Sequence, residues 1–229
     1  MLKFLLQVLD WSEIWALLIP LFVLLFHRKQ PAYLKPVIIY LWLALMINLV
    51  IDIIMGFNIY RIDLPAWLNS NNPFYNIHSI TRFICFSIFF IRLPQTSFII
   101  LKKILVTLSV VFIIINFAIF ENFFNPDHLS GNLLAAEAYL LLVYCVLYYL
   151  SVLRNGNDGL TNGQDFWVVT GLSIYVVTNF FVFLFYVPML DVNLVLANNM
   201  WYVHNIAFII FCIFITKALY GPFRHKLRI

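Results

Sequence analysis

Seven long apolar segments, separated by short connections, occupy nearly the whole chain of 229 residues. They cover residues 9–26, 36–55, 73–91, 103–120, 132–153, 166–187 and 199–219. Each is close to the roughly 20 residues that a helix needs to cross about 30 Å of hydrocarbon. This pattern restricts the fold severely, because a chain in a bilayer must satisfy its backbone polar groups within helices or closed barrels.

The segments favour helices over a barrel. Strands of a membrane barrel alternate polar and apolar residues, whereas runs such as VVFIIINFAIF at 110–120 are almost continuously apolar. The composition agrees, with 64% hydrophobic residues, 10% charged residues and a mean hydropathy of +0.95. We therefore predict an all-α protein, a polytopic transmembrane bundle of seven helices that forms a single domain over residues 1–229.

The first apolar segment is expected to stay in the protein as a helix. A secretory signal peptide would end in a small-residue cleavage site, and none is visible here. Instead, Glu13 lies near the start of the segment, and the basic run HRK at 27–29 follows it directly.

The basic residues predict the orientation of the bundle. Positively charged residues in short loops favour the cytoplasmic side of a membrane. Of the 14 Lys and Arg residues, Lys3 and Arg61 fall on one side and Arg82 lies inside a helix. The other eleven fall on the opposite side: Arg28, Lys29, Lys35, Arg92, Lys102, Lys103, Arg154, Lys217, Arg224, Lys226 and Arg228. The N-terminus is therefore predicted outside and the C-terminus in the cytoplasm.

Residues 220–229 form a short basic tail on the predicted cytoplasmic side. Lys and Arg next to a helix end commonly bind anionic lipid head groups, so we expect the lipid bilayer to be the first partner of this tail. Docking of a cytoplasmic or membrane signalling protein is the alternative. The modest net charge of +4 shows no nucleic-acid-binding footprint.

Polar residues inside the predicted helices gather at one depth. At a rise of about 1.5 Å per residue, His78 lies on the order of 7 Å and Arg82 on the order of 13 Å from Pro73, where the third helix begins. Other polar side chains of the outer half are Asn48, Asp52, Asn116, Glu137, Asn179, His204 and Asn205. The inner half carries mainly hydroxyls and aromatic rings. This asymmetry predicts a polar cavity that opens to the outside and is closed toward the cytoplasm.

The candidate ligand-binding residues share helix faces that we expect to point into the bundle, as polar stripes in membranes almost always do. They are Asp52, His78, Arg82, Glu137, Asn179, His204 and Asn205. A charge at the centre of a membrane helix is costly, so Arg82 is expected within salt-bridge reach of Asp52 or Glu137. A purely structural role for this pair remains open. Trp201 and other aromatic residues near helix ends are most simply an interfacial belt.

The layout resembles the seven-helix sensor regions that bacterial signalling proteins place ahead of a cytoplasmic output domain. This resemblance implies a sensor or receptor-like protein of the cell membrane, in this case a bacterial inner membrane. It would bind a small polar ligand or a membrane partner and would need no cofactor or metal. Because the sequence ends ten residues after its last apolar segment, the output is expected to belong to a separate protein.

Two other functions fit parts of the pattern. His78, His204, Asp52 and Glu137 offer ligands for zinc, and in this respect the chain is similar to the alkaline-ceramidase-like hydrolases, although their paired His motif is missing because Phe208 follows His204 by four residues. The second alternative is a small-solute or proton-coupled transporter, in which the acidic and His residues relay protons. Helices broken by Gly or Pro at matching places, which transporters commonly use, are not evident here.

Overall fold

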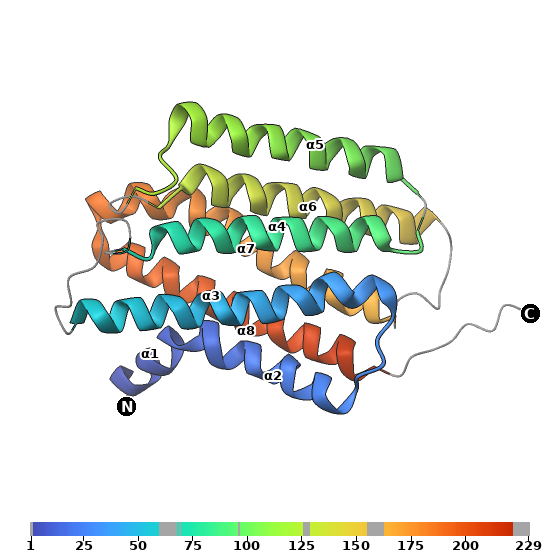
Figure 1. Cartoon of the computed structure of the whole chain (residues 1–229), viewed down its shortest axis with the longest axis horizontal. Coiled ribbons are helices and arrows are strands. Elements are labelled where there is room, and N and C mark those ends of the chain that lie inside the picture. The colour runs from blue at the N-terminus through green and yellow to red at the C-terminus, as the bar shows by residue number, and fades with distance from the viewer. Residues whose placement is uncertain are drawn as a thin grey trace, which may run out of the picture.

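The computed structural model describes residues 2–59, 68, 70–95, 97–125, 129–154 and 163–221, and the regular structure in these ranges is entirely helical. The chain folds into a bundle of long helices that run back and forth (Figure 1). In order, the elements are α1 (Leu2–Asp10), α2 (Ser12–Phe26), the 3-10 helix η1 (Ala32–Leu34), α3 (Lys35–Ile59), α4 (Asn72–Arg92), α5 (Ile99–Ile115), the π-helical turn η3 (Asn116–Phe120), α6 (Gly131–Arg154), α7 (Gln164–Val192) and α8 (Leu194–Tyr220).

The predicted all-α membrane bundle is confirmed. Within the described ranges, six helices are long and apolar enough to cross a membrane, and the number rises to seven if α1 and α2 form one span. Most helices continue several residues beyond their apolar segments. The extension is greatest for α7 and α8. Backbone hydrogen bonding can continue a helix beyond the residues that are apolar enough to lie in a membrane.

The first segment differs from the expected single helix over residues 9–26. It starts at Leu2 and breaks at Trp11, where α1 and α2 meet at an angle of 64°. The break leaves backbone carbonyls without helical partners, and side chains satisfy two of them. Trp15 Nε1 donates to the carbonyl of Val8 at 2.8 Å, and Asn205 Nδ2 donates to the carbonyl of Leu9 at 3.1 Å.

The two ends of the bundle differ in charge. One end, called here the N-terminal end, holds α1, η3, the ends of α3 and α7, and the starts of α4, α6 and α8 (Figure 1). The opposite end holds the ends of α2, α4, α6 and α8 and the starts of α3, α5 and α7, with the described basic residues Arg28, Lys29, Lys35, Arg92, Lys102, Lys103, Arg154 and Lys217. The orientation of this bundle in a membrane remains a prediction, and residues 222–229 of the basic tail lie outside the described ranges.

Packing between helices is uneven. The most extensive contact joins α7 and α8, and α2 packs against both α8 and α3. Gly171 on α7 permits this approach, because a Cβ there would lie 2.4 Å from the Cβ of Phe214 on α8. In contrast, α5 lies at the edge of the bundle (Figure 1), and only 11% of its apolar stretch is buried, compared with 44–56% in the other spanning helices.

Aromatic rings fill the bundle between Arg82 and the end opposite the N-terminal end. Phe86 is fully buried, and its ring centroid lies 5.1 Å from Tyr40 and 5.7 Å from Phe211. One turn further along α4, Phe90 stacks on Tyr144 at 5.2 Å. These contacts place a dense aromatic core between Arg82 and the opposite end of the bundle.

Candidate functional site

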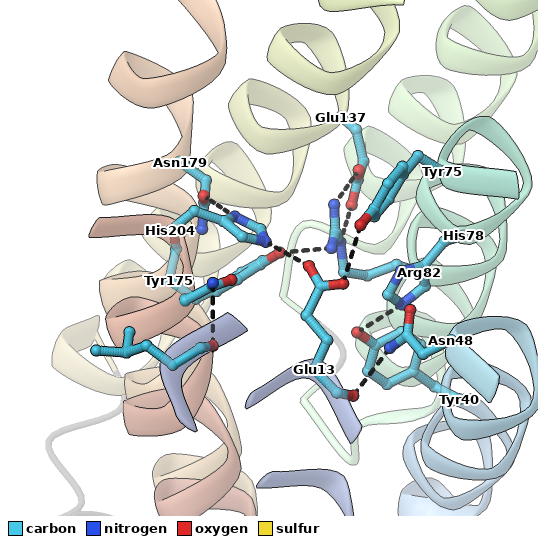
Figure 2. A network of polar contacts seen from close by, with 12 residues as sticks. Glu13, Tyr40, Asn48, Tyr75, His78, Arg82, Glu137, Tyr175, Asn179 and His204 are labelled. Carbon is cyan, nitrogen blue, oxygen red and sulfur yellow. Dashed lines mark hydrogen bonds and ion pairs between the residues drawn. The ribbon is translucent and has the colours of Figure 1, made fainter. Parts of the chain in front are cut away.

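Arg82 and Glu137 form the centre of a buried polar network (Figure 2). Arg82 Nε donates to Glu137 Oε1 at 2.5 Å, and Nη2 donates to Oε2 at 2.6 Å. Ser79, one turn earlier on α4, also donates to Glu137 Oε2, at 2.5 Å. The third nitrogen, Nη1, donates to the hydroxyl of Tyr175 at 2.5 Å. The pair therefore joins α4, α6 and α7 with its charges matched and hydrogen-bonded, as a buried ion pair requires.

Glu13 of α2 is the second carboxylate of the network. Its side chain projects between α4 and α8 (Figure 2), where Tyr75 OH donates to Oε2 at 3.2 Å and His204 Nε2 contacts Oε1 at 3.2 Å. Unlike Glu137, whose side chain is 2% exposed, Glu13 keeps 13% of its side chain accessible. It is therefore the carboxylate of this network that is better placed to meet a solute.

His204 connects Glu13 to Asn179 through its two ring nitrogens. Asn179 Nδ2 donates to the carbonyl of Tyr175 at 2.8 Å, so Asn179 Oδ1 faces His204 Nδ1, 2.5 Å away. Nδ1 must then carry a hydrogen, because an amide oxygen only accepts. The contact between His204 Nε2 and Glu13 needs a further hydrogen, carried by either the imidazole or the carboxyl group. That hydrogen lies between the two groups, so Glu13 would balance a positive charge on His204.

His78 and Asn48 line the α3 side of the network (Figure 2). His78 Nε2 lies 3.4 Å from the hydroxyl of Tyr40, and the two rings are nearly parallel. Asn48 Nδ2 donates to the backbone carbonyl of Glu13 at 2.9 Å. Asn48 thus helps to hold the turn of α2 that presents the Glu13 carboxylate.

The structure brings together most, but not all, of the seven predicted site residues. His78, Arg82, Glu137, Asn179 and His204 are buried within the polar level described above. The predicted salt bridge of Arg82 is confirmed with Glu137. Asn205 instead holds the carbonyl of Leu9, and Asp52 lies on an exposed face of α3.

Glu13 is the main residue of the network that was not among the predicted site residues. The signal was present, since Glu13 is an acidic residue one or two turns inside an apolar segment, at the same end as the other polar residues. The break at Trp11 could not be read from the apolar pattern. That break explains how Glu13 enters the bundle with Tyr75 and His204 as partners.

A cavity of about 410 Å³ opens at the N-terminal end above this network. We call it the vestibule; it is lined by the aromatic residues Tyr75, Tyr186, Trp201 and Tyr202, the polar residues Asp10, Asn71, Asn72 and Asn198, and Leu129 and Leu190. A chamber of about 20 Å³ shares Tyr75, Leu129 and Trp201 with it and is also lined by Glu13, Arg82, His78 and His204. The chamber has room for about one water molecule.

The described residues do not assemble a metal centre. Within the described ranges, no group of three or more His, Cys, Asp or Glu side chains could hold a metal ion. His78 and His204 contact different partners, Tyr40 and Asn179, and Asp52 lies apart from both on the exposed side of α3. The ligand set that a zinc hydrolase would need is therefore not gathered in this arrangement.

Comparison with protein-family models, curated proteins and solved structures finds no match for this chain. Its function must be argued from the site itself.

Proposed function

We propose that this chain is a receptor-like membrane sensor that binds a small polar ligand in the vestibule and relays the event to a separate signalling protein. The observation that carries the proposal is the vestibule itself, a cavity of about 410 Å³ that shares Tyr75 and Trp201 with the charged chamber beneath it. This volume suits a small molecule, since ligand sites typically enclose about 300–1,000 Å³. In the predicted orientation, the vestibule faces the outside of the cell.

The contacts of Trp201 offer a route from the vestibule to the helices. Its indole ring packs 5.0 Å from the ring of His204, which in turn contacts Glu13 on α2 and Asn179 on α7. A ligand that moves Trp201 would therefore act on the contacts among α2, α7 and α8. Such shifts of packed helices are a common form of signal transmission.

The same three helices are joined again at the opposite end of the bundle. Gln164, the first residue of α7, donates through Nε2 to Gln30 Oε1 at 3.0 Å and to the carbonyl of Ala218 at 2.8 Å. Gln30, which follows α2, donates to the carbonyl of Leu219 at 3.0 Å. This connection supports a relay, because a shift of α8 at the vestibule would have to be accommodated where a cytoplasmic partner is expected to dock.

Ligand-dependent thermal stabilisation tests the proposal. Purified protein is heated with each of four probes: choline chloride, glycine betaine, sodium acetate and sorbitol. We expect at least one to raise Tm in the wild type and in Trp42→Leu, whose tryptophan is 48% exposed on α3, but not in Trp201→Leu. A stabilisation that persists in Trp201→Leu, or the lack of stabilisation by all four probes, would contradict the proposal.

Metal analysis separates this proposal from the hydrolase alternative. Zinc bound at one equivalent and lost in both His78→Ala and His204→Ala would favour the enzyme. His27→Ala is the matched control, because His27 lies at the opposite end of the bundle, beyond α2.

A transporter is the second candidate, and the break between α1 and α2 favours it. Discontinuous helices at the level of a buried charge are typical of transporters, and Glu13 lies two residues beyond the break. Uptake of a probe by protein reconstituted in sealed vesicles, driven by a proton gradient and lost in Glu13→Gln, would support transport over sensing.

A further inference from the structure

We propose that the ligand of the vestibule is a small organic cation, whose ammonium group is held against aromatic rings above Glu13. The inference rests on the proposed function of the vestibule as a recognition site and names the class of molecule that it takes. Three properties of the cavity lead to it: its aromatic lining, its charge and its size.

The aromatic lining is the first property. Four of the described residues that line the vestibule are aromatic, and Trp201 is in contact with two of the others. Its ring centroid lies 5.4 Å from Tyr75, nearly perpendicular to it, and 5.3 Å from Tyr186. Aromatic rings grouped around a cavity attract cations through their negative faces, and such cages recognise quaternary ammonium ligands. A belt of isolated interfacial rings would not need to surround a cavity.

The charge of the site is the second property. Arg82 is paired with Glu137, and Glu13 would balance a positive charge on His204. Asp10, on the vestibule wall, then supplies one negative charge. Among the described residues that line the vestibule there is no Lys or Arg to balance it. An anionic ligand would be repelled, whereas a cation would supply the missing charge.

The size of the cavity is the third property. The chamber of about 20 Å³ is too small for an organic ligand, so such a ligand stays in the vestibule of about 410 Å³. Tyr75 lines both spaces and donates through its hydroxyl to Glu13. Tyr75 thus links an aromatic wall of the vestibule directly to the Glu13 carboxylate.

Choline and its uncharged carbon analogue 3,3-dimethyl-1-butanol form the central test, because they differ mainly in charge. Binding is measured by tryptophan fluorescence and calorimetry in nanodiscs of phosphatidylglycerol, which has no ammonium head group. We expect saturable binding of choline and at least about 10-fold weaker binding of the analogue. Trp201→Leu should weaken choline binding about 10-fold, and Asp10→Asn roughly 2- to 5-fold. Trp42→Leu should leave it unchanged.

Repeating the choline titration in phosphatidylcholine nanodiscs identifies the source of the ammonium group. A weaker apparent affinity there indicates that lipid head groups compete for the vestibule. An unchanged affinity indicates a free solute. Both results support recognition of an organic cation.

Other outcomes overturn the inference in distinguishable ways. If acetate or sorbitol stabilises the protein through Trp201 while choline does not bind, the vestibule remains a recognition site but not for cations. If choline and its neutral analogue bind equally well, or if choline binding is the same in Trp201→Leu and Asp10→Asn as in the wild type, the cation site is not the vestibule. If no probe of any class binds, the proposed function fails together with this inference.

Discussion

Arg82 on α4 and Glu137 on α6 lie side by side in two parallel hydrogen bonds, buried in the interior of the bundle. Their side chains are 5% and 2% exposed, so water contributes little to the solvation of either charge. Each group is therefore the main reason that the other can be charged there. The first prediction follows from this dependence.

Removal of one member of the pair should cost more stability than removal of both. Arg82→Leu or Glu137→Leu alone leaves an uncompensated buried charge, and we expect a loss of about 3–5 kcal/mol. The double variant Arg82→Leu/Glu137→Leu removes both charges and should recover most of that loss. Unfolding of the four proteins in detergent by a denaturant series measures the interaction energy. Equal and additive losses would show that the two charges do not depend on each other.

Glu13 should tolerate Gln but not Ala. In Glu13→Gln, the amide oxygen can accept from Tyr75 and the amide nitrogen can donate to Nε2 of a neutral His204, so both contacts survive without the shared proton. We expect its Tm to stay close to that of the wild type. Glu13→Ala leaves the partners unsatisfied and should cost about 1–3 kcal/mol. The two variants are compared by thermal unfolding, and the idea fails if Gln destabilises as much as Ala.

Gly171 and Gly56 provide a matched test of helix packing. An added Cβ at Gly171 would lie 2.4 Å from Phe214 Cβ, whereas one at Gly56 would meet nothing within 4 Å. Gly171→Ala should therefore separate α7 from α8 and cost about 1–3 kcal/mol, as overpacking does. Gly56→Ala should be neutral or slightly stabilising, because Ala favours helices. Unfolding midpoints of the two variants decide the point, and similar values would argue against a close approach of α7 and α8.

Reporter fusions test the predicted orientation. Alkaline phosphatase is active only outside the cytoplasm, so a fusion within residues 121–131 should be active and a fusion after residue 229 inactive. The reason is the concentration of Lys and Arg at the opposite end of the bundle. The reverse pattern of activity would turn the vestibule toward the cytoplasm and remove an extracellular ligand from the proposal. A fusion at residues 93–98, between α4 and α5, serves as a second inactive control.

The candidate site was only partly predictable from the sequence. Helical periodicity and depth together placed His78, Arg82 and Glu137 at one level, and that prediction needed no knowledge of neighbouring helices. Asp52 met the same criteria but lies on an exposed face of α3. Depth along a helix follows from residue count, whereas the direction of a face depends on which other helices surround it.

The sequence by itself determined the class of the fold and the approximate limits of its helices, because a bilayer accepts long apolar segments almost only as helices. It also determined that charged groups would be collected at one level. Only the tertiary structure decided which partners they have. The break at Trp11 places Glu13 in contact with Tyr75 and His204, and the packing of α4 against α6 places Arg82 in contact with Glu137. These pairings depend on how the helices pack and on which side chains satisfy the carbonyls freed at the break. Both depend on several segments of the chain together, so no single segment predicts them.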